Sequence, residues 1–493
     1  MSEKSLKKNA AYNVIRNVMQ LAYPLVTFPY ASRILLPEGI GKVNFANSII
    51  SYFLLVAGLG VNIYGIREGA KARNNRAELS KLSCELLTIN LISTGIAYIL
   101  FVLALFFIPK LEEYRRLLCI CSATIIFTTL GIDWLYGALE DYRYITIRSA
   151  VFQGISLVFL FLIVKNAQDY VKYAGISVFA SVGSNLLNFF HSRKFITFKF
   201  DRNLELKKHL KPVFILFAWS LSISIYTVLD ITMLGLMAGD ASVGIYSAAI
   251  KLNKMVVGLI TSASMVLLPR LSFYIGQQKS DEFIELIHKS FNFLLCISIP
   301  AAVGLFLLSK PIILLFCGPN YTPAIPIMQI MSPIVFIIAI GHPIAIQLFM
   351  PLGKEKLTLF SIVCGAICNF SLNLFLIPRF GALGAGIATL CTEIIILAVQ
   401  MILARKYLNL RKTGLNFVQC LIAVIFMTAA ILVVLHFISA IILQIVVSIV
   451  MGIFIYSSLL LVMRNKMICS LADSGIYQIK NHFKNIIKGK SLP

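Results

Sequence analysis

Apolar runs of about 20 residues recur along the whole chain and are separated by short polar segments. A run of this length crosses the hydrocarbon core of a bilayer as an α-helix, whereas barrel strands would show runs of about 10 residues that alternate in polarity. The pattern predicts an all-α polytopic membrane protein with about fourteen transmembrane helices. The expected helices cover residues 12–33, 39–63, 82–108, 116–139, 145–164, 171–191, 212–237, 242–269, 290–309, 325–350, 357–378, 383–404, 416–437 and 440–463.

The composition and the distribution of charge support this class. Of the 493 residues, 59% are hydrophobic and 13% are charged, and the mean hydropathy is +0.87, which excludes a soluble domain. Most of the 44 Lys and Arg residues fall in the tails and the even-numbered connections, which predicts that both termini are cytoplasmic. The net charge of +23 then reflects orientation and attraction to anionic membrane lipids, so nucleic acid is not expected as a partner.

Motifs typical of other protein classes do not occur in the sequence. Lys4, Lys7 and Lys8 resemble the basic start of a signal peptide, but the apolar segment that follows is too long for one, so we expect it to remain as the first span. The ten cysteines include no CxxC pair, so no metal site is expected. The phosphate-binding motif GxxxxGK followed by Ser or Thr does not occur, so we expect no nucleotide motor and no cofactor.

Several segments resemble one another at a nearly constant spacing. Two pairs of positions are 203 residues apart and a third pair, later in the chain, is 211 residues apart, as if a short insertion separated them. The pairs are Gly41 with Gly244, Arg67 with Arg270, and Ala174 with Ala385. Their common order indicates an internal repeat.

The repeat predicts two six-helix bundles, residues 1–205 and 206–410, followed by residues 411–493 with two extra helices and a basic cytoplasmic tail. Because each bundle would contain an even number of helices, the repeats would be parallel and related by an axis along the membrane normal. Two bundles that rock about a central site are typical of a transporter.

Three charged residues, Asp230, Lys251 and Lys254, lie inside predicted helices on either side of a short Gly/Asp turn. A charge at the centre of a membrane helix costs about 2.5 to 3.5 kcal/mol on insertion scales, so such residues usually face a cavity or a partner. Lys251 and Lys254 share one helix face, because they are three residues apart. A structural salt bridge between Asp230 and Lys251 is the alternative, and it would still leave the charge of Lys254 for an anion.

Five short motifs occur in order along the chain, at residues 32–41, 133–140, 230–235 with 244–251, 316–321 and 377–386. Together they resemble the Wzx-type polysaccharide flippases, the polysaccharide-transport branch of the multidrug/oligosaccharidyl-lipid/polysaccharide exporter superfamily. The resemblance covers about residues 10–410, and its spacing suits fourteen helices. Leu36 departs from the pattern, where the family commonly has Gly, and so does Tyr136, where Phe followed by Gln is common.

The resemblance implies that the chain is a flippase and not an enzyme. Its cargo would be an undecaprenyl-diphosphate-linked oligosaccharide, moved by alternating access from the cytoplasmic to the outer leaflet of the bacterial cytoplasmic (inner) membrane. The products would be O-antigen, capsule or exopolysaccharide, and other polysaccharide assembly proteins would be partners. The residues expected to bind the diphosphate or the sugars are Lys251, Lys254, Arg16, Arg33, Arg67 and Arg270.

Alternatives exist for several of these residues. Arg33, Arg67 and Arg270 lie near helix ends, where they could simply extend to lipid headgroups. Glu393, Asp133 and Asp230 are candidates for coupling transport to H⁺ or Na⁺, because an isolated buried carboxylate binds a proton more readily. Hydrogen bonding between helices is the structural alternative for the carboxylates. The membrane potential alone could also drive an anionic cargo outward, at about 2.3 kcal/mol per charge per 100 mV.

Three other functions remain open on the sequence. A cation-coupled multidrug exporter of the same superfamily would favour acidic residues inside the membrane, whereas Arg and Lys are more frequent here. A lipid II flippase would share the architecture. A membrane glycan polymerase usually has a large outer loop, but the longest expected outer loop, at residues 310–324, is short.

Overall fold

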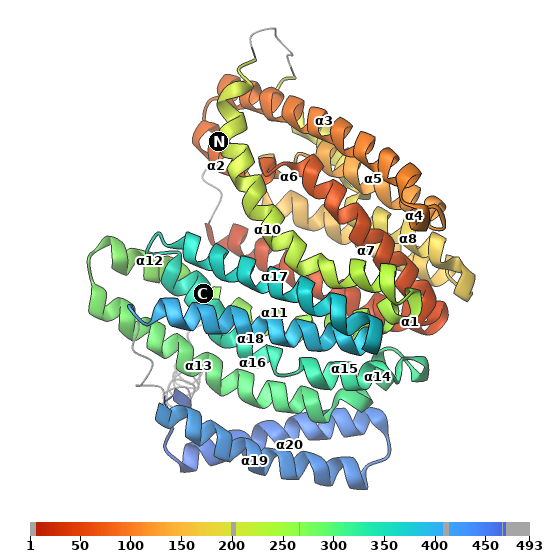
Figure 1. Ribbon diagram of the computed structural model, residues 1–493. Helices are drawn as coiled ribbons and strands as arrows, with labels where there is room; N and C mark the ends of the chain where they lie inside the picture. Colours follow the sequence, from red (N-terminus) through yellow and green to blue (C-terminus); the bar gives the residue numbers. More distant parts are fainter. Residues whose placement is uncertain (1–5, 199–203, 266, 408–413, 466, 470–493) are drawn as a thin grey trace, which may run out of the picture. The chain divides into compact units, whose positions relative to one another are not determined.

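The computed structural model describes residues 6–198, 204–265, 267–407, 414–465 and 467–469, and within these ranges every regular element is a helix (Figure 1). Ten of the described helical segments are long and apolar enough to cross a membrane. The predicted class, an all-α polytopic membrane protein, is therefore confirmed. The number of fourteen crossings and the cytoplasmic termini stay predictions.

The hydrophobic runs coincide with helices along the described chain. In the first half these are α1 (Leu6–Gly58), α2 (Val61–Ala72), α3 (Arg76–Phe107), α4 (Pro109–Glu112), α5 (Arg115–Gly131), α6 (Asp133–Ala138), α7 (Tyr142–Ile163), η1 (Ala167–Asp169), α8 (Tyr170–Val178), η2 (Phe179–Gly183), α9 (Asn185–Ser192) and α10 (Lys207–Met237). They continue with α11 (Asp240–Met265), α12 (Leu268–Gly276), α13 (Ser280–Leu307), α14 (Ser309–Phe316), η3 (Pro319–Tyr321), α15 (Ala324–Met331), α16 (Ile334–His342), η4 (Pro343–Phe349), α17 (Glu355–Phe380), α18 (Ala382–Ala404), α19 (Gly414–Phe437) and α20 (Ile441–Val462).

The first two predicted helices form one continuous element, α1, with a break at Leu36. The backbone of Leu36 has φ 59° and ψ 175°, outside the helical region. The next residue is Pro37, whose ring keeps the preceding residue out of the α conformation. A leucine with positive φ is strained by roughly 1 to 3 kcal/mol, which explains why glycine would suit this position.

Two glycines bring the break in α1 against the start of α11. A Cβ atom at Gly41 would overlap the backbone carbonyl of Asp240, and a Cβ atom at Gly244 would overlap the carbonyl oxygen of Pro37. Pro37 and Asp240 are separated by the same 203 residues as Gly41 and Gly244. The two contacts are thus equivalent under the repeat, as a two-fold axis of rotation would produce. Only residues without a side chain allow the backbones to approach so closely.

The chain forms two compact units. The first contains Met1–Ala248, Phe316–Pro323 and Ala366–Ala388, and the second contains Ala249–Leu315, Ala324–Gly365 and Thr389–Pro493. The three segments predicted from the repeat, which divide the chain near residues 205 and 410, stay a prediction, because a repeat is defined by symmetry and not by compactness.

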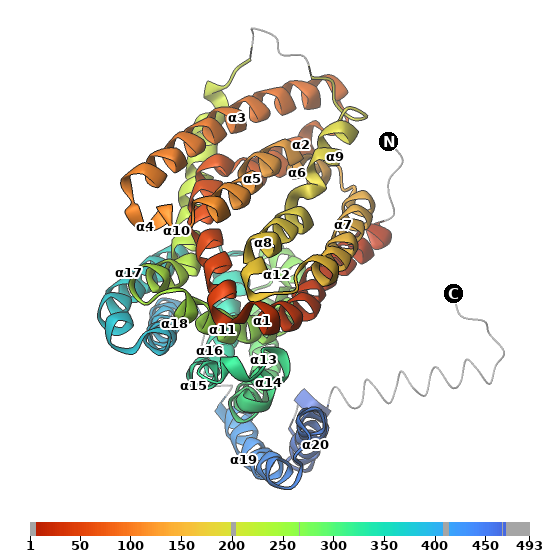
Figure 2. The ribbon, with the colours of Figure 1, turned by 90° about the vertical axis from the view of Figure 1, so that its right-hand side faces the viewer.

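In the first unit, α1 packs against α3, α5, α7 and α10 (Figure 2). One apolar core of this unit gathers side chains from α2, α3, α6 and α10, among them Val61, Leu86, Trp134 and Val213. This core holds the ends of these helices together, and it lies beside the polar cluster around Glu85 described below.

In the second unit, α13 packs against α16 and α19, and α19 and α20 lie side by side as an antiparallel pair (Figure 1). Their core includes Cys296, Leu308, Cys420 and Tyr456. A further core joins α12, α13 and η4 through Leu271, Phe283 and Phe349. The extra pair of helices, α19 and α20, therefore packs on the rest of the second unit through apolar side chains.

Candidate functional site

The six cations expected to contact the cargo are distributed over both units. In the first unit, Arg16 is half-buried and Arg33 exposed on α1, and Arg67 is exposed on α2. In the second unit, Lys251 is half-buried and Lys254 exposed on α11, and Arg270 is exposed on α12. Their convergence on a single path stays a prediction.

Arg67 and Arg270, which the repeat aligns, have similar surroundings. The guanidinium of Arg67 lies 5.4 Å from the ring centre of Tyr64, and that of Arg270 lies 5.5 Å from the ring centre of Tyr274. The Nε of Arg67 also forms an ion pair of 2.9 Å with Glu68, and the Nε of Arg270 donates to the Tyr274 hydroxyl at 3.0 Å. Both arginines are therefore held in place by neighbours on their own helices.

Asp230 is the centre of a buried hydrogen-bonded cluster in the first unit. Its Oδ2 accepts from the Tyr246 hydroxyl at 2.6 Å, and its Oδ1 accepts from the Asn373 amide at 2.7 Å. The Asn373 amide also donates to Asn369 Oδ1 at 3.0 Å. The cluster joins α10, α11 and α17. The asparagines were not predicted from the sequence, although two amides four residues apart in an apolar helix are a signal of a shared polar face.

Asp133, a candidate for ion coupling, lies beside an arginine that the sequence analysis missed. Asp133 Oδ1 accepts from the Asn188 amide at 2.7 Å and lies 3.6 Å from Nη2 of Arg148. The Arg148 Nη1 donates to the carbonyl of Ser184 at 3.4 Å. Asp133 is thus the counter-ion of a buried arginine in this structure. The available signal was an arginine within the apolar run at residues 145–164.

Glu393, the other candidate carboxylate, is buried on α18 in the second unit. A role in ion coupling for Glu393, Asp133 or Asp230 stays a prediction. Among the residues that the structure describes, no group of three or more His, Cys, Asp or Glu side chains could hold a metal ion.

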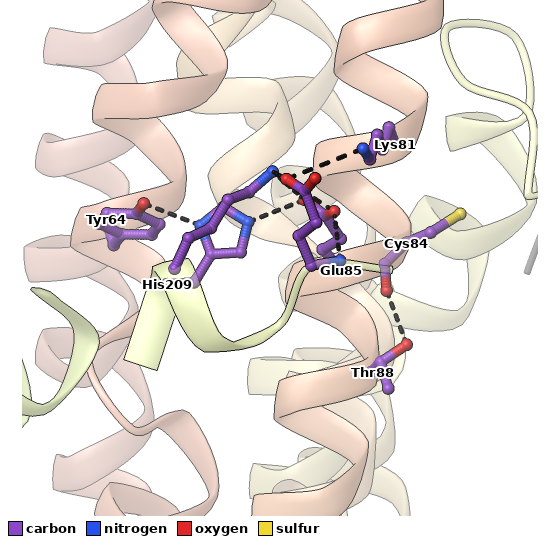
Figure 3. A network of polar contacts seen from close by, with 8 residues as sticks. Tyr64, Lys81, Cys84, Glu85, Thr88 and His209 are labelled. Atoms are coloured by element: carbon purple, nitrogen blue, oxygen red, sulfur yellow. Dashed lines mark hydrogen bonds and ion pairs between the residues drawn. The ribbon is translucent and has the colours of Figure 1, made fainter. Parts of the chain in front are cut away.

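A further, closely paired cluster of the first unit surrounds Glu85 (Figure 3). Glu85 Oε2 lies 2.8 Å from Nε2 of His209 and 3.2 Å from Nζ of Lys208, and Oε1 accepts from the backbone N–H of Glu205 at 3.0 Å. The other ring nitrogen of His209 hydrogen-bonds the Tyr64 hydroxyl at 2.8 Å, so the imidazole lies between Tyr64 and Glu85.

The Glu85 cluster ties the start of α10 to α2 and α3, beside a polar hollow of about 590 Å³. Glu85 and His209 are only 1% and 3% exposed. Burial at this level requires partners, because an uncompensated buried charge is costly. This cluster was not predicted from the sequence, since 124 residues separate Glu85 from His209.

These features define a multi-pass helical membrane protein in which ionisable side chains are buried between packed helices. The chain belongs to the family described as polysaccharide biosynthesis protein, which matches residues 6–275. The MatE family matches residues 216–375. The resemblance to the polysaccharide branch of the multidrug/oligosaccharidyl-lipid/polysaccharide exporter superfamily is therefore confirmed.

Two curated relatives align with most of the chain. Proteins named "Putative O-antigen transporter" from Escherichia coli (strain K12) and Shigella dysenteriae are 22% and 25% identical to it over 408 and 403 residues. The alignments cover 82% and 80% of this chain and 97% and 99% of the relatives. Among solved structures, "Lipid II flippase MurJ, inward closed conformation" has a TM-score of 0.76 at 17% identity, over 93% of this chain and all of that one. This similarity shows a shared fold.

Proposed function

We propose that the chain is a flippase for lipid-linked oligosaccharides. It moves an undecaprenyl-diphosphate-linked repeat unit from the cytoplasmic to the outer leaflet of the bacterial cytoplasmic membrane, where other assembly proteins extend it into O-antigen or a related polysaccharide. The observation that carries this proposal is the alignment with two relatives named as O-antigen transporters over nearly their whole length.

The chemistry of the cargo agrees with features of both units. A diphosphate needs cations, and the six predicted cationic residues include two, Lys251 and Lys254, within one membrane helix. A lipid tail needs apolar surface, and the second unit has an apolar hollow of about 520 Å³ between α13, α19 and α20. Its lining includes Pro300, Gly304, Met427 and Gly452. These features support an amphiphilic cargo over a small soluble one.

We assign the primary diphosphate contact to Lys251 and Lys254. Arg16, Arg33, Arg67 and Arg270 are the further cations of the path, and Glu393, Asp133 and Asp230 are the candidates for ion coupling. Outward movement of a cargo with about two negative charges is also favoured by the membrane potential. The excess of cations over carboxylates therefore supports transport driven at least partly by voltage.

The test is transfer of a fluorescent undecaprenyl-diphosphate oligosaccharide in proteoliposomes. We expect transfer by the wild type and its loss in the double variant Lys251→Ala with Lys254→Ala. The matched control is Lys354→Ala with Lys356→Ala, which removes the same charge from an exposed turn and the start of α17. Equal transfer by both double variants would make the lysines of α11 structural.

Two further measurements separate the alternatives. Transfer measured with lipid II in place of the oligosaccharide tests whether the chain moves the cargo named for the solved structure of the same fold. Transport of an organic cation tests whether the chain is a multidrug exporter. An imposed potential, compared with a pH or Na⁺ gradient, identifies the driving force. Transfer that ignores the potential and follows an ion gradient would contradict the voltage hypothesis and direct attention to the carboxylates.

A further inference from the structure

Arg148 is a buried arginine whose hydrogen-bonding capacity is only partly used. Arg148 is 8% exposed, and its Nε has no hydrogen-bond partner in the part of the chain that the structure describes. Its contacts with the Ser184 carbonyl, at 3.4 Å, and with Asp133, at 3.6 Å, are long. Charged hydrogen bonds between arginine and an anion are usually 2.7 to 2.9 Å. The guanidinium therefore has one donor without a partner, Nε, and two nitrogens, Nη1 and Nη2, with long contacts.

A second arginine increases the positive charge around Arg148. Arg16 on α1 lies near enough to repel it, and the Arg16 Nε is likewise buried without a hydrogen-bond partner among the described residues. Like charges held together in a region of low dielectric are unfavourable unless an anion lies near them. Asp133 supplies one negative charge, which leaves one positive charge on this pair of arginines.

An open hollow of about 390 Å³ adjoins this region in the first unit. Arg143, Tyr144, Arg148 and Asp141 give it a polar side, and its other walls are apolar. Those walls are Ile147, Val151, Phe152 and Leu187. The net charge of the polar residues that line it is positive, because two arginines outnumber the carboxylate of Asp141. A charged side next to an apolar wall suits an amphiphile with an anionic head.

We propose that Arg148, with Arg16 and Arg143, binds the phosphate groups of a prenyl diphosphate, while the apolar wall contacts the first part of its chain. Arg148 follows the start of α7 by about two helical turns, on the side that the charge distribution predicts to be cytoplasmic. The inference rests on the proposed function, and it places a first contact for the cargo before it reaches the lysines of α11. Planar guanidinium groups match phosphate oxygens in geometry as well as charge.

Asp133 acts in this arrangement as an internal competitor. It lies 3.6 Å from Nη2 of Arg148 and holds this position until a diphosphate provides stronger and more numerous acceptors. Asn188, which donates to Asp133, keeps the carboxylate in place. Removal of the Asp133 charge should therefore strengthen binding of an anionic ligand, whereas a merely structural ion pair would show only a loss of stability when either partner is changed.

The test uses the purified full-length protein in nanodiscs of neutral lipid and farnesyl diphosphate as a soluble probe. We expect Arg148→Gln to weaken binding about tenfold, since a charged hydrogen bond is worth roughly that much. Asp133→Asn should tighten binding several-fold, and Arg148→Lys should restore part of it. Arg115→Gln, at an exposed position on α5, is the matched control and should leave binding unchanged.

Several outcomes would overturn the inference. Binding of farnesol that equals binding of farnesyl diphosphate would show that only the apolar wall is used. Unchanged binding in Arg148→Gln, or weaker binding in Asp133→Asn, would assign the pair a structural role. Competition by anionic phospholipid at its membrane concentration would assign the site to a lipid headgroup instead of the cargo.

This test is independent of the test of the proposed function. Farnesyl diphosphate binding that depends on Arg148 in a protein that moves no oligosaccharide would support the site and contradict the flippase proposal. Transfer of oligosaccharide that is unaffected by Arg148→Gln, together with absent probe binding, would support the flippase and contradict the site.

Discussion

The clusters around Glu85 and Arg148 lie in the same unit but differ in how completely their charges are paired. The Glu85 carboxylate contacts His209, Lys208 and a backbone N–H at 2.8 to 3.2 Å. Arg148 has contacts of 3.4 and 3.6 Å, and its Nε lacks a partner in the described ranges. A buried charge whose partners are complete holds helices together, whereas one with spare donors can also receive a ligand.

The largest effect on stability should follow from breaking the complete cluster. We expect Glu85→Ala to destabilise the protein by about 3 kcal/mol, because it leaves His209 and Lys208 without their shared partner. The midpoint of thermal unfolding in detergent measures this change. Glu78→Ala, at an exposed position on the same helix, serves as the control. A similar loss of stability in both variants would show that the Glu85 cluster contributes no more to stability than an exposed carboxylate does.

A smaller effect is expected from the incomplete cluster. Arg148→Gln should lower the free energy of unfolding by about 1 to 2 kcal/mol, since it removes one long ion pair and one long hydrogen bond. Arg143→Gln, which removes an exposed arginine from the same hollow, should change stability by less than about 0.5 kcal/mol. Destabilisation by Arg148→Gln as large as that by Glu85→Ala would remove the contrast between the clusters.

The smallest effect concerns a well-paired carboxylate in a connection outside the membrane spans. Asp169 forms a 2.7 Å ion pair with Lys172 and accepts from the backbone N–H groups of Lys165 and Asn166. The Lys172 ammonium and these N–H groups lower the pKa of Asp169 from 3.8 to about 2. Its contribution to stability is therefore complete above about pH 4 and is lost as the pH falls towards 2.

The matched variant for this prediction is Asp169→Asn. It should unfold at a slightly lower temperature than the wild type at pH 7, and the difference should shrink as the pH falls from 4 to 2. Unfolding midpoints of both proteins across this range test the sign. A difference that grows on acidification would contradict the assignment of Asp169 as the group that loses its charge.

The helices themselves could be predicted from the sequence, because a membrane helix must be both apolar and about 20 residues long. Their ends were less predictable. The sixth predicted helix is divided into α8, η2 and α9, and the tenth into α15, α16 and η4. The expected gap between the first two helices is a single distorted residue, Leu36, within α1. Such local changes of helix geometry depend on packing and leave hydrophobicity unaltered.

The candidate site was predicted less completely. The sequence singled out Asp230 and Asp133 as charged residues in apolar runs, and the structure buries Asp230 and leaves Asp133 partly exposed beside Arg148. The sequence did not identify Asn373, Tyr246 or Arg148 as their partners. The structure places Asp230 between hydrogen-bond donors on two other helices, one of which is 143 residues away in the chain. The pattern of hydrophobic residues does not indicate which residues far apart in the sequence come into contact.

By itself, the sequence determined the membrane class, the approximate helices, the charge asymmetry and the motifs of the family, because each of these depends on residues that are neighbours in the chain. Only the tertiary structure decided which ionisable side chains meet. Glu85 faces His209 and Asp133 faces Arg148 because α3 packs near the start of α10 and α6 packs near α7. The free energy of a buried charge depends on those neighbours, so its role as a structural tie or a binding group is set by packing.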